Sequence, residues 1–514
     1  MLARVNSIGL RGVDGFPVVV ELDLAGGLPA FTTVGLPDHA VKESRERVAS
    51  AVRNSGFKFP SRRITVNLAP ARPRKEGSHY DLPIALALLA ASGQASCGEW
   101  ETNWCFIGEL SLDGRVRPVS GALAMAERAR AEGFRAIVVP EENAAEACAA
   151  GLRAVPVADL REAVSLLDGG ALRTARAVPS SPDENRAGSI LDLADVRGQT
   201  AAKRALEIAA AGGHNLLLIG PPGIGKSMLA RRLPGLMPPM SEAEAVEVTK
   251  VQSACGKPPF GGLARTRPFR APHHACSAAA LVGGGPSARA GEICLAHGGV
   301  LFLDELAEFP RPALEALRQP LEDRSVRVAR AKDTFEYPAR FLLMAATNPC
   351  PCGWRGHPRR GCSCAAPQVA RYLSRLSGPL LDRIDLQVEM PAVVFSDWAS
   401  DGVGAETSEA VRARVAKARE LQRARLGDGP AALNAFVAAP VARRHARLDL
   451  AGLSVLSAAE RSAALSARAL DRVVRVARTI ADLAGAETVA PSHLAEALHY
   501  RALDRLRSAL EAQR

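Results

Sequence analysis

The chain has 514 residues, of which 47% are hydrophobic and 23% charged, a composition typical of a folded globular protein long enough for about three domains. No apolar run approaches the ~20 residues needed to cross a bilayer, and no long apolar core follows the first residues. We therefore expect neither a membrane span nor a secretory signal, and the cytoplasm as the compartment. The formal net charge of +11 at pH 7 suits a polyanionic partner such as nucleic acid.

The first region, residues 1–170, alternates predicted strands with predicted helices. Apolar and β-branched runs predict strands at 16–24, 63–68, 106–110 and 136–140. Helical patterns cover 40–54 and start again at Asp81, which we expect to cap the second helix. An α+β domain is therefore expected, followed by a linker at 171–190 that contains Pro, Ser and other polar residues.

A phosphate-binding loop lies in the second region, residues 191–395. The pattern GxxxxGK[ST] is matched without exception by Gly220, Pro221, Pro222, Gly223, Ile224, Gly225, Lys226 and Ser227. An apolar strand precedes the loop, and a helical pattern closed by Pro234 follows it. In this context the backbone N–H groups would bind phosphate oxygens, Lys226 would reach the β- and γ-phosphates, and the Ser227 hydroxyl would ligate Mg²⁺. The expected cofactors are ATP and Mg²⁺.

Two later strands of this region end in polar residues. An apolar run at 299–303 ends in Asp304 and Glu305, and a second run at 341–347 ends at Asn348. Asp304 would hold Mg²⁺ through water, and Glu305 would polarise the attacking water. A strand can end in acidic residues by chance, but an upstream phosphate loop makes nucleotide hydrolysis the favoured interpretation.

Two insertions interrupt the second region. Residues 325–338 alternate on both sides of a polar tip, which predicts a β-hairpin. Its tip carries Arg330 and Lys332, which either contact a nucleic-acid backbone or stay solvated. The other insertion carries His273 and His274, which lack a third ligand at metal spacing, so we expect them in structural or pore-lining roles.

Four cysteines cluster directly after Asn348, in an insert at 350–364. They form two C-x-C pairs, Cys350 with Cys352 and Cys362 with Cys364. Four thiolates on two short turns suit tetrahedral Zn²⁺, although the spacing is tighter than the usual C-x₂-C. Since such a cluster is rarely plain packing in a reducing compartment, we expect a zinc site, with His357 as an alternative ligand.

The last region, residues 405–514, is predicted to be mostly helical. A basic amphipathic helix at 411–425 presents either a solvated face or a nucleic-acid contact. A second basic helix at 465–479 carries Arg468 and Arg475.

Part of the first region resembles the proteolytic, S5-like domain of Lon proteases. The resemblance rests on residues 108–121, a following helix, and residues 138–143. Lon proteases use a Ser–Lys dyad, but here Ser78 lies one position early in its turn and Leu123 occupies the lysine position. Because a serine hydroxyl without a base is not activated, we expect a Lon-protease-like domain without peptidase activity.

The chain as a whole resembles the magnesium-chelatase-like AAA+ ATPases of the competence protein ComM family. The most specific segments are 35–38 (GLPD), 67–70 (NLAP), 271–274 (APHH) and 348–353 (NPCPCG). The resemblance covers nearly the whole chain. It implies a multidomain α/β protein with a Lon-protease-like domain, an AAA+ core with β-hairpin insertions, and a C-terminal helical lid.

The same resemblance implies residue roles and a function. Asn348 would be the sensor of the γ-phosphate, and Arg383 would act in trans on the neighbouring subunit's transferring phosphate. Arg468 would be the second sensor, with Arg475 as the other candidate. The implied function is a hexameric, ATP-driven DNA motor that promotes branch migration while single strands are integrated in natural transformation.

Three other interpretations stay open. A metal-insertion chelatase subunit would share the ATPase core, but would not be expected to carry the Lon-like region. A Lon-type protease would need the missing lysine. A remodelling ATPase that does not act on DNA would need no basic hairpin.

Overall fold

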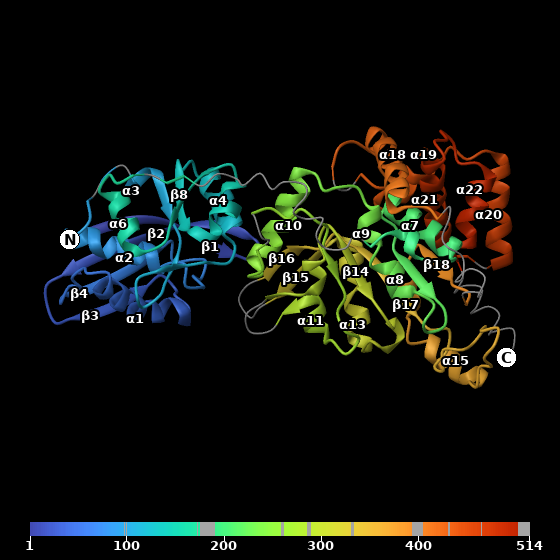
Figure 1. The fold of residues 1–514 in the computed structure, drawn as a ribbon, viewed down its shortest axis with the longest axis horizontal. Coiled ribbons are helices and arrows are strands. Elements are labelled where there is room, and N and C mark those ends of the chain that lie inside the picture. The colour runs from blue at the N-terminus through green and yellow to red at the C-terminus, as the bar shows by residue number, and fades with distance from the viewer. Residues whose placement is uncertain are drawn as a thin grey trace. The chain divides into compact units, whose positions relative to one another are not determined.

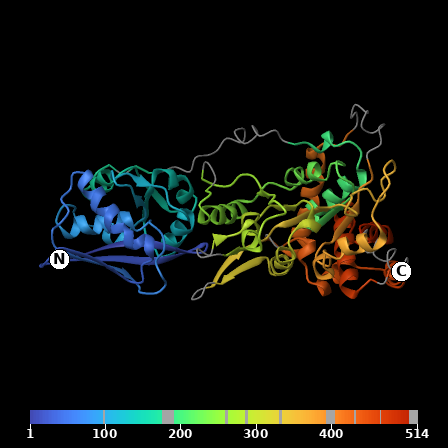
Figure 2. The same ribbon diagram turned by 90° about the horizontal axis from the view of Figure 1, so that it is seen from below.

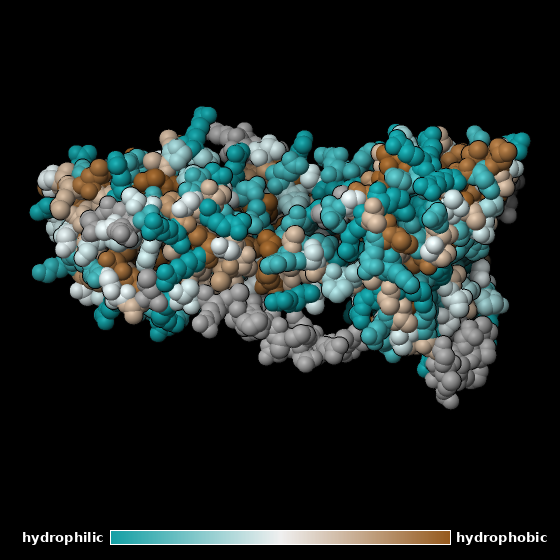
Figure 3. Space-filling model, turned by 90° about the horizontal axis from the view of Figure 1, so that it is seen from above, coloured by the Kyte–Doolittle hydropathy of each residue, from teal (hydrophilic) through white to brown (hydrophobic). Residues whose placement is uncertain are grey.

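The computed structural model describes residues 1–96, 98, 100–171, 173–174, 191–258, 262–284, 289–329, 334–392, 405–429, 432–463 and 465–501. The chain forms two compact units. The first unit comprises Met1–Glu184, Ser241–Arg265 and Asp333–Tyr337, and the second comprises Asn185–Met240, Thr266–Lys332 and Pro338–Arg514. None of the helices in these ranges is both long and apolar enough to cross a membrane. On the face drawn in Figure 3, hydrophilic residues predominate and hydrophobic residues form only small patches.

A four-stranded sheet in the order β1-β2-β4-β3 forms one layer of the first unit. Its strands are β1 (Leu2–Arg11), β2 (Asp14–Ala25), β3 (Ala30–Val34) and β4 (Arg63–Ala69). Helices α2 (Asp81–Ala91) and α4 (Ala122–Ala131) pack on β1 and β2, and α1 (His39–Asn54) packs on α2, so the helices gather on one face of the sheet (Figure 2). Every residue of α2 is buried, which makes this helix the centre of the unit's hydrophobic core.

A parallel sheet in the order β5-β8-β9 completes the first unit. The remaining elements are α3 (Trp100–Asn103), β5 (Trp104–Phe106), β6 (Glu109–Leu110), β7 (Val116–Arg117), β8 (Ala136–Pro140), α5 (Ala144–Cys148), β9 (Arg153–Val157) and α6 (Leu160–Leu167). The strands predicted at 16–24, 63–68 and 136–140 and the helix at 40–54 are confirmed. The strand predicted at 106–110 is wrong as one element, because the chain leaves β5 after Phe106 and starts β6 at Glu109.

Asp81 does not cap α2 as expected. Tyr80 occupies the cap position, and Asp81 is the first helical residue, completely buried. Its carboxylate accepts two hydrogen bonds from Arg47, at 2.6 Å from Nε and 3.0 Å from Nη2. A buried carboxylate needs a charged partner more than a helix end needs a cap, so the pairing with Arg47 decides where this side chain points.

One helix from the middle of the chain packs within the first unit. Helix α10 (Glu242–Ala254) lies against α4, where Gly121 N–H lies 3.0 Å from both the carbonyl oxygen and the Oγ of Ser253. The Lys250 ammonium lies 3.0 Å from Asp14 and 3.1 Å from Glu127. Residues between the phosphate loop and the second half of the ATPase region therefore help to build the first unit.

The second unit is built on a five-stranded sheet in the order β11-β14-β17-β10-β18. Figure 1 labels β14, β17 and β18 of this sheet. Its strands are β10 (Leu216–Ile219), β11 (Phe269–Arg270), β14 (Val300–Leu303), β17 (Leu342–Thr347) and β18 (Leu386–Glu389). All the neighbouring pairs are parallel. Because the carboxyl ends of parallel strands meet at one edge, the loops that follow β10, β11, β14 and β17 are brought together there.

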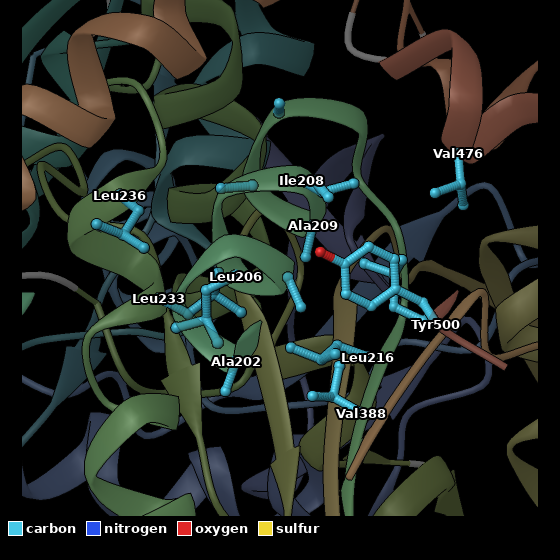
Figure 4. Packing of buried hydrophobic residues seen from close by; sticks show 14 of the residues in the cluster. Ala202, Leu206, Ile208, Ala209, Leu216, Leu233, Leu236, Val388, Val476 and Tyr500 are labelled. Carbon is cyan, nitrogen blue, oxygen red and sulfur yellow. The ribbon is translucent and has the colours of Figure 1, made fainter. Parts of the chain in front are cut away.

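Helices α7 (Thr200–Gly212), α18 (Ser408–Leu426) and α21 (Ala467–Leu483) share one hydrophobic core with this sheet. Alternate residues of each strand, such as Leu216 and Leu218, face that core. Figure 4 shows the Tyr500 ring beside Leu216 and Val388, where it covers the end of the sheet at β18. The helices predicted around 201–210, 411–425 and 465–479 are confirmed.

The basic helix α18 serves the fold itself. Arg419 donates to the carbonyl oxygen of Ala210 from Nε (3.0 Å) and Nη2 (2.6 Å), and Gln422 donates to that of Ala211. These bonds satisfy the last carbonyls of α7, which have no partner inside their own helix. Arg425 pairs with the buried Asp482 at 2.7 Å. Some of the basic side chains that were candidates for a nucleic-acid contact therefore bind groups within the protein instead.

Most of the other elements of the second unit are short. The loop helices are α8 (Lys226–Ala230), α9 (Leu233–Leu236), α11 (Ala278–Val282), α12 (Glu292–Leu295), α13 (Arg311–Ala316), α14 (Arg318–Asp323), α15 (Ala366–Leu373) and α16 (Gly378–Leu381). Helices α19 (Ala439–Ala446) and α22 (Pro491–His499) pack on α21, and α20 (Leu450–Ala463) packs on α22. Strand β12 (Gly283–Gly284) pairs with β13 (Arg289–Ala290). Pro234 lies in the first turn of α9, where a missing N–H costs little, so the expectation that it closes the preceding helix is wrong.

Candidate functional site

The phosphate loop joins β10 to α8 at the carboxyl edge of the five-stranded sheet. Gly223 and Gly225 have φ angles of 79° and 93°, in the left-handed region that favours glycine. A Cβ added at either residue would meet no atom within 4 Å, so both glycines face open space. The loop is therefore shaped to leave its backbone N–H groups accessible to an anion.

Lys226 lies inside this loop. Its ammonium Nζ donates to the carbonyl oxygens of Gly220 (2.6 Å) and Pro221 (2.8 Å), and to Asn348 Oδ1 at 3.1 Å. Burial lowers the pKa of Lys226, while the carboxylates of Asp304 and Glu305 oppose that shift. The structure thus brings Asn348, at the end of β17, to the lysine of the phosphate loop.

Two oxygen ligands for a divalent cation also meet here. The Ser227 hydroxyl donates to Asp304 Oδ2 at 2.6 Å. Ser227 is the last residue of the phosphate loop pattern, and Asp304 directly follows β14. The two residues are far apart in sequence and meet because β10 and β14 lie in the same parallel sheet. Hydroxyl and carboxylate oxygens beside a phosphate loop are a donor set that fits Mg²⁺ bound to a nucleotide.

Glu305 has an unusual backbone and an unexpected partner. Its φ of 52° lies in the left-handed region, which costs a residue with a side chain about 1 kcal/mol or more. Its carboxylate Oε2 lies 3.0 Å from Nδ1 of His274. His274 follows β11, the edge strand next to β14, so both residues sit at the same edge of the sheet. Sequence reasoning missed this contact because β11 has only two residues and gives no strand pattern.

Arg383 is held within its own chain. It pairs with Glu322 of α14, and its Nη1 donates to the carbonyl oxygen of Pro379 at 2.7 Å. Its buried Nε has no hydrogen-bond partner among the described residues. An arginine that acts on a neighbouring subunit would have to leave Glu322.

The two candidates for the second sensor lie on α21. Arg468 is exposed in the first turn, whereas Arg475 lies deeper, near Asp385. Burial would raise the pKa of Asp385, but His214, Arg472 and Arg475 lower it below its usual value. Within the described ranges, no hydrogen bond or ion pair joins either arginine to the phosphate loop, so both assignments stay predictions.

The predicted hairpin is present, but its tip cannot be described. β15 (Ser325–Ala329) and β16 (Thr334–Pro338) form a two-stranded sheet. Arg330 and Lys332 lie outside the described residues.

The four cysteines of the insert converge. The Sγ atom of Cys350 lies 3.4 Å from that of Cys352 and 3.6 Å from that of Cys362. All four Sγ atoms lie within 4.8 Å of one another. The backbone N–H of Trp354 donates to Cys352 and is the main cause that lowers its pKa to about 6. Four thiols at these distances can share one tetrahedral cation such as Zn²⁺.

His357 is not part of this sulfur cluster. Its Nδ1 accepts the backbone N–H groups of Arg359 (3.1 Å) and Arg360 (3.0 Å), so this nitrogen shapes the turn between the cysteine pairs. The group of candidate metal ligands consists of the four cysteines alone in the part of the chain described.

A cavity of about 620 Å³ adjoins the start of the phosphate loop. Gly220 and Pro221 of the phosphate loop line it, together with Arg355 and Gly356 of the cysteine insert and with Tyr500. Apolar strand residues, an arginine and a carboxylate, Glu389, therefore border one space next to the loop. A cavity of this kind suits a ligand with both an apolar ring and charged groups.

Among the described residues of the first unit, the side chain of Ser78 is hydrogen-bonded to a carboxylate and not to a lysine. The Ser78 hydroxyl donates to the Glu109 carboxylate, and Leu123 is fully buried in α4. Lys75 is near Ser78 in sequence, but its ammonium donates to the carbonyl oxygen of Pro70. Burial lowers the pKa of Lys75. The lack of peptidase activity therefore stays a prediction.

The phosphate loop lies between β10 and α8, and neighbouring parallel strands end at Asp304, Glu305 and Asn348. This arrangement defines a P-loop nucleotide-binding protein of the AAA+ class. The chain belongs to the magnesium-chelatase-like AAA+ family that includes the ComM and YifB proteins.

Family descriptions match three parts of the chain. "Magnesium chelatase, subunit ChlI" matches residues 192–397, "Subunit ChlI of Mg-chelatase" matches 20–143, and "Magnesium chelatase, subunit ChlI C-terminal" matches 405–501. Competence protein ComM of Haemophilus influenzae is 44% identical over 485 residues, which cover 94% of each chain. Uncharacterized protein YifB of Escherichia coli is 44% identical over 483 residues, 94% of this chain and 93% of YifB. Uncharacterized protein Rv2897c of Mycobacterium tuberculosis is 47% identical over 494 residues, 94% of this chain and 95% of the relative.

A more distant similarity covers a smaller part of the chain. Lon protease of Chloroflexus aurantiacus is 27% identical over 168 residues, which cover 30% of this chain and 20% of that protease. The fold is thus the expected multidomain α/β one, with a Lon-like region, an AAA+ core and a helical C-terminal region.

Proposed function

We propose that this protein is an ATP-driven motor that acts on DNA and promotes the integration of single strands during natural transformation. The observation that carries the proposal is the meeting of Lys226, Ser227, Asp304, Glu305 and Asn348 at one edge of the sheet. The similarity to a competence protein over nearly the whole chain supports the link to DNA uptake.

Each residue of the site has a role in hydrolysis. The backbone of residues 220–227 and Lys226 bind the phosphates, and Ser227 and Asp304 hold Mg²⁺, which neutralises charge on the transferring phosphate. Glu305 orients and deprotonates the attacking water. Asn348 reports the state of the γ-phosphate, since it already contacts Lys226.

The motor works as a ring, for which we propose six subunits. Arg383 leaves Glu322 when a neighbour binds, and completes that neighbour's site. Arg468, or Arg475 in its place, senses the nucleotide from the helical region, residues 405–514. Residues 191–395 form the ATPase core, and the Lon-protease-like domain at 1–170, joined by the linker 171–190, serves as a scaffold. Arg330 and Lys332 at the hairpin tip contact the DNA backbone.

The cysteine insert binds one zinc ion. The closeness of the sulfurs of Cys350, Cys352, Cys362 and Cys364 supports this assignment. Metal analysis of purified full-length protein should find about one zinc per chain, and the double variant Cys350→Ser, Cys352→Ser should have lost it. A folded, fully active protein that contains no metal would show that the cysteines have another purpose.

The central test is ATP hydrolysis with single-stranded, duplex and forked DNA. We expect stimulation by single-stranded or forked DNA and ATP-dependent movement of a branch point. Hydrolysis that ignores all three DNAs would instead favour a magnesium-chelatase-like remodelling ATPase that does not act on DNA.

A further inference from the structure

The cysteine insert touches the phosphate loop. Gly353, between the two cysteine pairs, has a φ of 83°, and a Cβ added there would lie 2.9 Å from Cδ of Pro222. Real Cβ atoms essentially never approach that closely, so the turn fits against the phosphate loop only because this residue is glycine. The insert also begins two residues after Asn348, whose amide oxygen accepts from Lys226.

The sulfur cluster fixes the position of the next residues. The backbone N–H of Arg355 donates to Cys350 Sγ, and that of Trp354 donates to Cys352 Sγ. The Arg360 guanidinium stacks on the Trp354 ring at 4.4 Å. A cation bound to the four sulfurs would hold these turns together, because the insert contains no regular helix or strand before α15.

Arg355 lies on the wall of the cavity next to the phosphate loop. It borders the same space as Gly220 and Pro221, and its side chain has no hydrogen-bond or ion-pair partner among the described residues. The insert, residues 350–364, contains three arginines and no acidic residue, and Arg355 is the one of the three that lines this cavity, which Glu389 of β18 also borders. A guanidinium in this position is complementary to a phosphate group.

We propose that the metal-bound insert forms one wall of the nucleotide site, and that Arg355 donates to a phosphate oxygen of the bound nucleotide. This inference rests on the ATP and zinc sites proposed above. Because the same turns hold the metal and Arg355, the two ligands are coupled: the metal tightens nucleotide binding, and the nucleotide tightens metal binding by the same factor.

Two pairs of variants test the wall itself. Nucleotide affinity is measured by calorimetry with ATP and ADP on full-length protein that also carries Glu305→Gln to prevent turnover. Arg355→Gln should weaken ATP binding about tenfold, the effect of losing a charge-assisted hydrogen bond, while Arg359→Gln in the same insert should have no effect. Gly353→Ala should weaken ATP binding, whereas Gly361→Ala, whose added methyl meets nothing within 4 Å, should not.

The coupling is tested with the metal. Zinc is removed with a chelator, and ATP affinity is compared before and after readdition. In the reverse experiment, the affinity for zinc is measured by competition with a chromogenic chelator, with and without ATP. We expect weaker ATP binding without zinc and, by the same factor, weaker zinc binding without ATP.

The outcomes separate this inference from the proposals beneath it. If the protein contains no metal, the zinc site is wrong and the coupling with it. If zinc is bound but Arg355→Gln and the metal-free protein bind ATP like the parent, the insert does not contact the nucleotide and the two ligands are not coupled. The zinc site would then still stand. If the parent does not bind ATP, the proposed function fails first.

Discussion

The imidazole Nδ1 of His274 lies 3.0 Å from Oε2 of Glu305, the carboxylate that we assign to activating water. Both side chains are partly exposed, so neither is fixed by burial alone. The contact orients the carboxylate toward β11, the strand that His274 follows, rather than leaving it free at the end of β14. The pair is therefore a point at which hydrolysis can be restrained.

His274→Ala should raise hydrolysis in the absence of DNA by about two- to fivefold, since a partly exposed side-chain hydrogen bond contributes about 0.5–1 kcal/mol. The ratio of DNA-stimulated to basal hydrolysis should fall correspondingly. Steady-state ATPase assays with and without DNA measure both. His273→Ala is the comparison variant, because the His273 ring packs on the His274 ring at 4.1 Å and its Nδ1 accepts the backbone N–H of Ala275. This variant removes the ring packing but keeps the contact between His274 and Glu305. A lower basal rate in His274→Ala would mean that the imidazole positions Glu305 for catalysis.

Lys226→Ala should abolish ATP binding, because the phosphate loop loses its charge. Glu305→Gln should bind ATP like the parent but hydrolyse it at least about 100-fold more slowly, since only the general base is lost. Equilibrium binding and turnover assays separate the two effects. Glu420→Gln, an exposed change on α18, should alter neither. Normal turnover by Glu305→Gln would show that another residue activates the water.

No peptidase activity is expected on unfolded protein substrates, with or without ATP. The motivating observations are the buried Leu123 and the Ser78 hydroxyl bound to Glu109. Ser78→Ala should leave ATP hydrolysis and DNA activity unchanged. Proteolysis of a labelled casein that disappears in Ser78→Ala would overturn this view of the first unit.

Replacing Arg330 and Lys332 together by alanine should weaken DNA binding and reduce its salt dependence by up to about two units of slope. Basal hydrolysis should survive, while stimulation by DNA and strand unwinding should fall. The comparison variant replaces Lys417 and Arg423, which are exposed on α18. If only the α18 variant loses DNA binding across a salt series, that helix and not the hairpin grips the DNA.

Arg47→Leu should destabilise the first unit by about 3–5 kcal/mol, because it leaves the Asp81 carboxylate buried without its partner. Urea unfolding followed by circular dichroism measures the loss. Arg45→Leu on the same helix removes only an exposed pair with Glu46 and should change the free energy of unfolding by no more than about 0.5 kcal/mol. An unchanged midpoint in Arg47→Leu would mean that water reaches Asp81.

The sequence alone determined the local parts of the site. The phosphate loop, the strands ending at Asp304 and Asn348, and the two cysteine pairs are each written in a short run of residues. Such runs are readable because a glycine turn, an apolar strand or a C-x-C pair needs only neighbours in the chain.

Only the tertiary structure decided which side chains meet. The strand order β11-β14-β17-β10-β18 brings His274 into contact with Glu305 and Asn348 into contact with Lys226. A hydrophobic pattern does not encode this order, because the strands are all similarly apolar. Charge patterns were ambiguous for the same reason: α18 looks like a basic surface, yet Arg419 is buried on the end of α7. Whether a charged side chain is free or engaged depends on partners distant in sequence, which come together only when the chain folds.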